Sequence, residues 1–252
     1  MWLAKPFEFV RTDAWRTFFS VAPVAAAVSE DPKRIAGEAA VAYVTDGMAV
    51  GLGTGTTVAH AIRRLGEVIR ERGIHILGVP TSASSAKLAK AAGVPLVALE
   101  DVDRLDLAID GADEVDPKLN LIKGGGGAHF REKVVARAAE KVVIVVDEEK
   151  IVPVLGTKSP VPVEVHPFGW KQTTAALEGL WCTATLRRVG DMPFLTDNGN
   201  YVIDCKFGPI PKPDKLEREI NNLPGVLENG LFVGLADVVL VGGPGGLRTL
   251  TA

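Results

Sequence analysis

Acids, a lysine and a run of glycines crowd one short stretch near the middle of the chain. They are Asp110, Asp113, Glu114, Lys123, the four glycines at 124–127, and Glu132. Glycine loses more backbone entropy on ordering than any other residue, so such a run suits a place where backbone N–H groups must approach a ligand. Together with the charged side chains, it favours proton transfer at an oxygen-rich substrate.

The glycine run and Glu132 suit two different parts of a proton transfer. Backbone N–H groups of the glycines can hold a developing oxyanion, and Lys123 can neutralise it. Glu132 falls early in a helix predicted at 128–139, within reach of the same substrate, and a carboxylate suits the transfer of a proton between neighbouring carbons. Two alternatives stay open: Glu132 as a stabilising charge in the first helical turn, and His129 as a rival base.

The acidic segment Asp-Gly-Ala-Asp-Glu-Val-Asp at 110–116 follows an apolar strand predicted at 105–109. Open α/β sheets bind ligands outside the carboxyl ends of their strands, which makes this segment a candidate site. A solvated acidic turn is the alternative. The residue order of an EF-hand calcium loop is absent.

A second glycine loop, Gly-Thr-Gly-Thr-Thr at 53–57, joins a predicted strand to a predicted helix. A strand-to-helix glycine turn brings free N–H groups and a helix N-terminus to one point, which favours an anion. The loop lacks the Gly-Lys-Ser/Thr of a Walker motif, and Val58 replaces the third glycine of a dinucleotide fingerprint. The pattern predicts a phosphate monoester site, with a tight turn for packing as the alternative.

Alternating strands and helices must position these loops. Helices are predicted at 33–44, 58–72, 84–92 and 128–139, and strands at 48–52, 74–79, 96–99, 105–109 and 142–146. The strands are continuously apolar, which is typical of a parallel sheet covered on both faces. We therefore predict an α/β fold: a Rossmann-like, mostly parallel sheet with helices on both faces.

The pattern changes after residue 158. Strands at 161–165 and 181–188 flank a helix at 171–180, an Asn-Gly hairpin turn is predicted between 194–195 and 201–203, and a helix at 215–222 follows. This predicts a smaller α+β (ferredoxin-like) domain at 159–233. A buried strand at 236–241 would then return the chain to the first sheet, so the catalytic domain comprises 31–158 and 234–252, and the smaller domain is an insertion.

Composition excludes several classes of protein. Of the 252 residues, 47% are hydrophobic and 23% charged, which supports a packed core and argues against disorder. The net charge is −3 without a long basic run, so no nucleic acid partner is expected. There is no apolar run long enough to predict a membrane span. Cys182 and Cys205 have no metal-binding spacing and suit packing in a reducing compartment, the cytoplasm.

Residues 1–30 form an N-terminal extension of unknown role. Residues 18–28 resemble a short signal segment, but the preceding stretch is long and carries Glu8 and Asp13, which opposes export. A frayed arm, a misplaced start codon and an organelle leader are the other interpretations.

In their joint order and spacing, these segments resemble ribose-5-phosphate isomerase of the A type, from about residue 31 to the C-terminus. The matching segments are 53–57, 110–114, 123–126, 131–133, 162–165, 196–200 and 222–226. Each is weak alone; together they are highly specific. The resemblance implies interconversion of D-ribose 5-phosphate and D-ribulose 5-phosphate through an enediolate, with neither a metal nor an organic cofactor.

The resemblance also implies roles for residues. Glu132 corresponds to the base that moves a proton between C2 and C1, Lys123 and the glycine N–H groups stabilise the oxyanion, and Asp110, with Asp113 and Lys123, assists ring opening. Its implied substrate-binding residues, the phosphate grip among them, are Gly53, Thr54, Gly55, Thr56, Thr57, Thr81, Ser82, Gly111, Ala112, Gly124, Gly125, Gly126, Lys33 and Lys150. The smaller domain resembles an oligomerisation domain, which implies a homodimer or a dimer of dimers.

Two other classes of function compete with the isomerase. A sugar-phosphate sensor without turnover should carry a helix-turn-helix, but residues 1–30 are too short and Pro23 interrupts them. An acyl-CoA transferase uses a related sheet and a glutamate nucleophile. The short loop at 53–57 and the acidic segment at 110–114 favour a compact sugar phosphate instead. The metabolic pathway and side activity on other sugar phosphates stay open.

Overall fold

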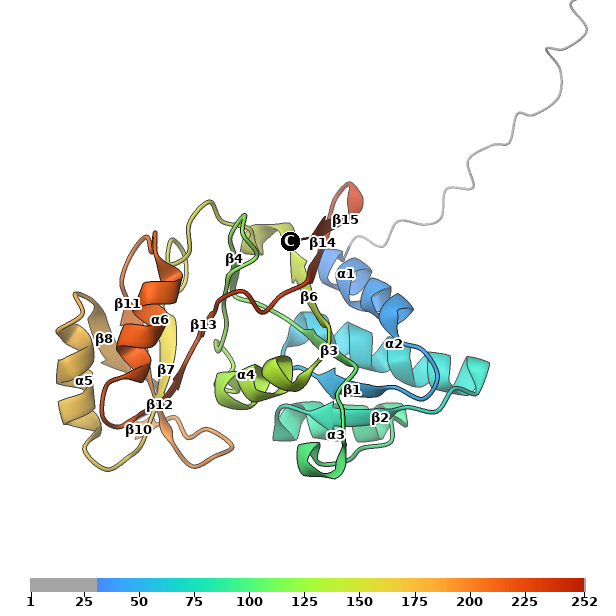
Figure 1. Cartoon of the computed structure of the whole chain (residues 1–252), viewed down its shortest axis with the longest axis horizontal. Coiled ribbons are helices and arrows are strands. Elements are labelled where there is room, and N and C mark those ends of the chain that lie inside the picture. The colour runs from blue at the N-terminus through green and yellow to red at the C-terminus, as the bar shows by residue number, and fades with distance from the viewer. Residues whose placement is uncertain (1–30, 252) are drawn as a thin grey trace, which may run out of the picture.

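The computed structural model describes residues 31–251, so the predicted N-terminal extension lies outside the described residues. A six-stranded sheet of order β15-β14-β6-β3-β1-β2 dominates one side of the molecule (Figure 1). Its strands are β1 (Ala49–Leu52), β2 (Leu77–Pro80), β3 (Leu107–Asp110), β6 (Val142–Asp147), β14 (Val238–Gly243) and β15 (Gly246–Thr251). All neighbours pair in parallel except β14 and β15.

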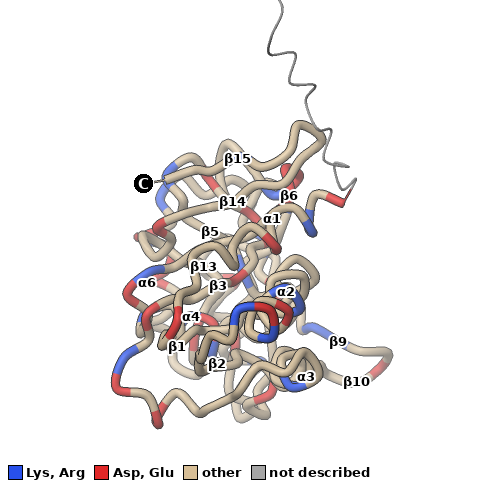
Figure 2. The backbone as a smooth tube through the Cα atoms, turned by 90° about the vertical axis from the view of Figure 1, so that its right-hand side faces the viewer, with Lys and Arg blue, Asp and Glu red and all other residues tan. Residues whose placement is uncertain are grey.

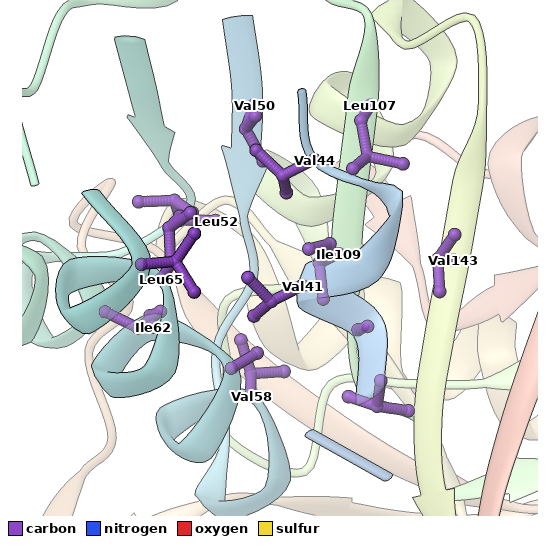
Figure 3. Packing of buried hydrophobic residues seen from close by; sticks show 14 of the residues in the cluster. Val41, Val44, Val50, Leu52, Val58, Ile62, Leu65, Leu107, Ile109 and Val143 are labelled. Atoms are coloured by element: carbon purple, nitrogen blue, oxygen red, sulfur yellow. The ribbon is translucent and has the colours of Figure 1, made fainter. Parts of the chain in front are cut away.

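Helices cover both faces of this sheet, as predicted. They are α1 (Pro32–Ala40), α2 (Thr56–Arg72), α3 (Ala83–Ala92) and α4 (His129–Ala138). Alternate residues of β3 enter different clusters: Leu107 and Ile109 join the core beneath α1 and α2, and Ala108 joins the core that contains Val135 of α4. In Figure 3, side chains of α2 pack toward those of β1. Each fully buried leucine or isoleucine contributes roughly 1.5–3 kcal/mol.

The strand order creates a crevice where the chain changes direction. From β1 the chain continues to β2 on one side, and β3 then pairs with the other side of β1. Loops that leave β1 and β3 therefore diverge at their carboxyl ends, the position at which open α/β sheets bind ligands. The loops concerned are 53–55 and 111–113.

A second, antiparallel sheet is built from residues 161–229, which we call the antiparallel unit. Its elements are β7 (Val161–Val165), α5 (Trp170–Glu178), β8 (Thr183–Leu186), β11 (Tyr201–Lys206), α6 (Pro213–Asn221) and β12 (Val226–Asn229). The strand order β12-β7-β11-β8 with one helix after β7 and one after β11 is the βαββαβ pattern of a ferredoxin-like fold. A short hairpin, β9 (Arg188–Val189) and β10 (Met192–Pro193), projects from it.

A three-stranded sheet connects the two parts. It consists of β4 (Glu114–Val115), β5 (Leu121–Ile122) and β13 (Leu231–Phe232), in the order β13-β5-β4. Figure 1 shows β13 running from the antiparallel unit toward the large sheet. The strand predicted at 236–241 is β14, and it pairs in parallel with β6.

Two local predictions are wrong. Residues 96–99 form no strand: Leu96 makes one isolated bridge to Gly78, and a 3₁₀ turn at Leu99–Asp101 then redirects the chain. Residues 194–195 do not pair with 201–203 as a hairpin, because β11 pairs with β7 and β8. The intervening turn instead folds over β7, where side chains of Thr196 and Asn200 donate hydrogen bonds to the buried Glu164.

Charges of both signs are interspersed along the backbone in the view of Figure 2. Among residues 31–251, no helix is long and apolar enough to cross a membrane.

Candidate active site

A cavity opens at the carboxyl ends of β1 and β3 and holds about 570 Å³ of space, including the part open to solvent. Its lining residues are Lys33, Thr54, Gly55, Thr56, Thr57, Val58, Gly111, Ala112, Asp113, Lys123, Gly124, Gly125, Gly126, Glu132 and Lys150. All three predicted loops, Glu132 and the two distant lysines therefore meet in one place.

Four of the predicted site residues are not among the lining residues: Gly53, Thr81, Ser82 and Asp110. Gly53 packs so closely against Asp110 that a Cβ atom at this position would collide with the carboxylate. Thr54 Oγ1 lies 2.9 Å from Thr81 Oγ1 and 2.7 Å from Ser82 Oγ. Ser82 also caps the N-terminus of α3. The structure thus places Thr81 and Ser82 where they support Thr54 rather than at the cavity surface.

Lys123 lies between two buried carboxylates. Its Nζ is 3.1 Å from Asp110 Oδ1 and 3.2 Å from Glu132 Oε2, and it donates a 2.6 Å hydrogen bond to Gly111 O. The side chain of Lys123 is 3% exposed. Asp110 Oδ1 also accepts hydrogen bonds from the backbone of Gly111 and Thr54.

These neighbours set the pKa values of the three groups. Burial, reinforced by the charge of Asp110, raises the pKa of Glu132 to about 8, against the opposing effect of Lys123. Burial also raises the pKa of Asp110 above its ordinary value, although Lys123 opposes this. Burial alone would lower the pKa of Lys123, but the two carboxylates outweigh it and raise that pKa. Glu132 can therefore exchange a proton near neutral pH beside a permanent cation.

The glycines at 124–127 form a tight loop, which we call the oxyanion loop. Gly124 and Gly127 have φ of +104° and +75°, which side-chain-bearing residues rarely adopt. Gly127 N donates to Gly124 O at 2.9 Å, and Gly125 N donates to Asp113 Oδ2 at 2.8 Å. Gly126 lines the cavity, and its N–H has no acceptor within the described residues. A substrate oxygen is the acceptor that would fit it.

The N-terminus of α2 lines the cavity's other wall. Gly55, with φ of +135°, precedes the helix, and no side chain caps it. The first-turn N–H groups of α2 and its dipole are thus available to an anion. Lys33 of α1 and Lys150, from the 3₁₀ turn Glu148–Lys150, line the same cavity. This wall fits a phosphate group.

Several polar residues of the acidic and glycine segments lie outside the site. His129 is fully buried, and burial together with the nearby Lys133 and Arg187 lowers its pKa to about 3, which opposes a role as base. Glu114 is also fully buried, and it accepts hydrogen bonds from the backbone of residues 156–159. Within residues 31–251, no cluster of three or more His, Cys, Asp or Glu side chains could hold a metal ion.

Sequence reasoning missed Arg187. This residue belongs to the antiparallel unit, yet its guanidinium donates to the carbonyl oxygens of Gly124 and Gly125. Nothing near Arg187 in the sequence signals this contact, because its acceptors are backbone atoms more than 60 residues earlier.

Comparisons with known proteins agree on one family. The model for ribose 5-phosphate isomerase A (phosphoriboisomerase A) matches residues 77–246. A ribose-5-phosphate isomerase A from Thermosynechococcus vestitus is 54% identical over 213 residues, covering 83% of this chain and 90% of its own. One from a Synechococcus species is 49% identical over 227 residues, covering 89% and 98%.

Solved structures show the same similarity. Ribose 5-phosphate isomerase A from Methanocaldococcus jannaschii superposes with a TM-score of 0.85 at 45% identity, covering 88% of this chain and 99% of its own. A D-ribose-5-phosphate isomerase in complex with phospho-erythronic acid gives a TM-score of 0.86 at 45% identity, covering 89% and 99%.

Proposed function

The chain belongs to the ribose 5-phosphate isomerase A family, and we propose that Glu132 is the base with which it interconverts ribose 5-phosphate and ribulose 5-phosphate. One observation carries this assignment: Glu132 is a carboxylate with a raised pKa that lines the cavity beside Lys123 and the oxyanion loop. A base whose pKa lies near the working pH combines proton affinity with a sufficient ionised fraction.

In the proposed isomerisation, Glu132, Lys123 and the oxyanion loop act on the open-chain sugar. Glu132 removes the proton from C2 of the open-chain aldose, and the electron pair forms the C1–C2 double bond while O1 becomes negative. Lys123 and the free N–H of Gly126 stabilise that charge. The proton returns from Glu132 to C1, the hydroxyl proton passes from O2 to O1, and the carbonyl now lies at C2.

Ring opening precedes this step, and we assign it to Asp110, Asp113 and Lys123 together. Asp113 lines the cavity, so its carboxylate can accept the proton of the anomeric hydroxyl. Lys123 can donate a hydrogen bond to the ring oxygen as the C1–O4 bond breaks, and the proton that Asp113 has taken then passes to that oxygen, so Lys123 keeps its charge for the isomerisation. Asp110 lies behind Lys123, 3.1 Å from its Nζ, and so acts through the lysine by holding and charging it.

The α2 wall would bind the 5-phosphate. Free N–H groups at residues 56–58, the hydroxyls of Thr56 and Thr57, and the ammonium groups of Lys33 and Lys150 surround one part of the cavity. Phosphate binding at a distance from C1 and C2 supplies energy for positioning the reacting carbons.

The assembly and compartment are further proposals. Exposed aromatic side chains on the antiparallel unit, Phe168 at 87% and Trp181 at 92%, favour a homodimer or a dimer of dimers through that unit. This fits the division into a catalytic domain (31–158 and 234–252) and a smaller domain (159–233). Free cysteines at 182 and 205 fit a reducing compartment such as the cytoplasm. Light scattering on the purified full chain would measure the assembly.

An assay of the purified full chain on ribose 5-phosphate tests the catalytic assignment. Wild-type protein should form ribulose 5-phosphate, and Glu132→Gln should lose nearly all turnover while keeping its circular dichroism spectrum. A folded Glu132→Gln enzyme with near-normal turnover would show that another group is the base.

A further inference from the structure

The oxyanion loop is held from outside the parallel sheet by one side chain, Arg187. Its Nη1 donates to Gly124 O at 2.9 Å and to Gly125 O at 3.0 Å. These are consecutive carbonyl groups of the loop, and both bonds come from a single nitrogen of the antiparallel unit. The side chain of Arg187 is only 16% exposed, so this contact is largely shielded from water.

Arg187 is itself fixed in place. Its Nε donates to Asp204 Oδ2 at 2.9 Å, and its Nη2 pairs with Asp204 Oδ1 on β11. Such a two-point contact between guanidinium and carboxylate fixes orientation as well as charge. The guanidinium also lies 5.7 Å from the ring centre of Phe194, which packs against Gly127 at the end of the loop.

The two carbonyls belong to two successive peptide planes, because each C=O shares its plane with the N–H of the next residue. The carbonyl of Gly124 shares its plane with Gly125 N–H, which donates to Asp113 in the cavity. The carbonyl of Gly125 shares its plane with Gly126 N–H, which has no acceptor within the described residues. One guanidinium therefore sets the direction of two donors on the opposite side of the loop.

We propose that Arg187 is a positioning residue for the isomerisation: it orients the 124–125 and 125–126 peptide groups so that one holds Asp113 and the other meets the enediolate oxygen. Its positive charge also polarises both peptide groups, which strengthens their N–H groups as donors. The proposal rests on the proposed role of the loop as the oxyanion site.

The geometry predicts how the effect divides between catalysis and binding. No residue of the antiparallel unit is among those that line the cavity, so Arg187 acts only through the loop. Within residues 31–251, the side chain of Arg187 makes no hydrogen bond to α2. Loss of Arg187 should therefore lower kcat and leave phosphate binding nearly unchanged.

Arg188 offers a matched control. It is the next residue in the chain and it is exposed, and among residues 31–251 its guanidinium donates only to Asp191 O within its own hairpin. Arg187→Met and Arg188→Met remove the same charge from adjacent positions. We expect kcat of Arg187→Met to fall by about 10- to 100-fold, somewhat less than the loss of a direct oxyanion donor. Arg188→Met should stay within twofold of wild type.

Two competition measurements complete the test. Phospho-erythronic acid, the compound bound in a related structure, carries both a carboxylate and a phosphate group. Its inhibition constant should rise about tenfold in Arg187→Met, and that of inorganic phosphate should not change. Arg187→Lys keeps the positive charge but lacks the planar guanidinium that binds Asp204 and the loop together. Its kcat should therefore lie between those of Arg187→Met and wild type.

The outcomes separate cleanly. A kcat of Arg187→Met within twofold of that of Arg188→Met would overturn the proposal, and so would an equal weakening of both inhibitors. If Arg187→Met fails to fold by circular dichroism, Arg187→Lys and Asp204→Asn carry the same two readouts. Glu132→Gln in parallel tests the base assignment itself: an active Glu132→Gln enzyme refutes that assignment whatever the arginine variants do.

Discussion

Two glutamates, Glu132 on α4 and Glu164 on β7, are buried to 4% and 0% exposure. In the described part of the chain, Glu164 Oε2 has no hydrogen-bond partner, and Glu132 Oε2 has only the ion pair with Lys123 Nζ at 3.2 Å. Their surroundings differ. Glu164 Oε1 accepts hydrogen bonds from three neutral side chains, those of Thr196, Asn198 and Asn200. Glu132 instead borders the cavity, with Lys123 and Asp110 close by.

The difference separates a structural carboxylate from a reactive one. Donors gathered around Glu164 tie the 196–200 turn to β7, and the Glu164 side chain is fully buried. Glu132 has few donors, a neighbouring cation and an opening, so its proton can be exchanged with a bound molecule. Burial alone does not mark a carboxylate as a candidate catalytic base; burial beside a cavity with a charged neighbour does.

The largest expected effect is on turnover in Glu132→Gln. General acid–base catalysis contributes roughly 10²- to 10⁴-fold, so kcat should fall by about that factor. Initial rates on ribose 5-phosphate measure it. If Glu164→Gln loses turnover to the same degree, the distinction between a reactive Glu132 and a structural Glu164 is wrong.

The stability of Glu132→Gln sharpens the same point. The pKa of Glu132 in the folded protein, about 8, lies above its ordinary value, so folding favours the protonated form. Wild-type stability should therefore fall as pH rises toward and through about 8, whereas the variant escapes this loss. Urea unfolding at pH 6 and pH 9 should show the variant gaining on the wild type at the higher pH; an unchanged difference would contradict the raised pKa.

The pH dependence of activity should follow the same group. Only ionised Glu132 can remove the C2 proton, so kcat/KM should rise by about tenfold per pH unit below about 8 and level off above it. Rates measured from pH 6 to pH 9 at fixed ionic strength check this. A flat profile between pH 6 and pH 8 would mean that Glu132 is already ionised there.

Glu164→Ala should act on stability instead. It removes the acceptor of three side-chain donors, of which Thr196 and Asn200 are buried, and an unsatisfied buried polar group costs about 1–3 kcal/mol. The free energy of unfolding in urea should drop by that amount, and Glu178→Ala, on the exposed side of α5, should change it little. Unchanged stability of Glu164→Ala would show that the 196–200 turn does not depend on this carboxylate.

The smallest effect concerns Lys33, which lines the same cavity as Glu132. Lys33→Ala should raise KM about tenfold, the loss expected for about 1.4 kcal/mol of phosphate binding, and leave kcat nearly unchanged. Arg34→Ala is the control, because Arg34 pairs with Glu38 on the surface of α1. A loss confined to kcat would place Lys33 in the chemical step.

The sequence was informative where function is local. Residues 53–57 and 110–113 lie at the carboxyl ends of buried strands, and 123–132 combine a lysine, glycines and a glutamate, so each segment was predicted as a candidate site. That the three segments form one site was implied by the family resemblance, and all three line one cavity. The covering of both sheet faces by helices was predictable from continuously apolar strands such as 142–146. Glu114 resembled its acidic neighbours in the sequence, and only its burial under residues 156–159 distinguishes it.

Contacts between distant segments left no such signal. Arg187 comes from the antiparallel unit, and its hydrogen bonds to the oxyanion loop go to backbone oxygens, which every residue carries. The wrong hairpin prediction at 194–203 has the same cause. Asn-Gly predicted a turn, and Gly199 does have φ of +77°. The side chains of that turn, however, bond to the distant Glu164, and no local strand pair forms.

The backbone of Lys123 depends on a part of the chain that is made much later. Its N–H donates to Gly230 O at 2.8 Å, and β5 just before it pairs with β13. A ribosome-bound chain that has emerged only as far as residue 206 contains every proposed catalytic side chain, but β5 then has β4 as its sole strand partner. We therefore expect turnover to begin only after synthesis has passed residue 232, so that activity would report the pairing of β13 with β5.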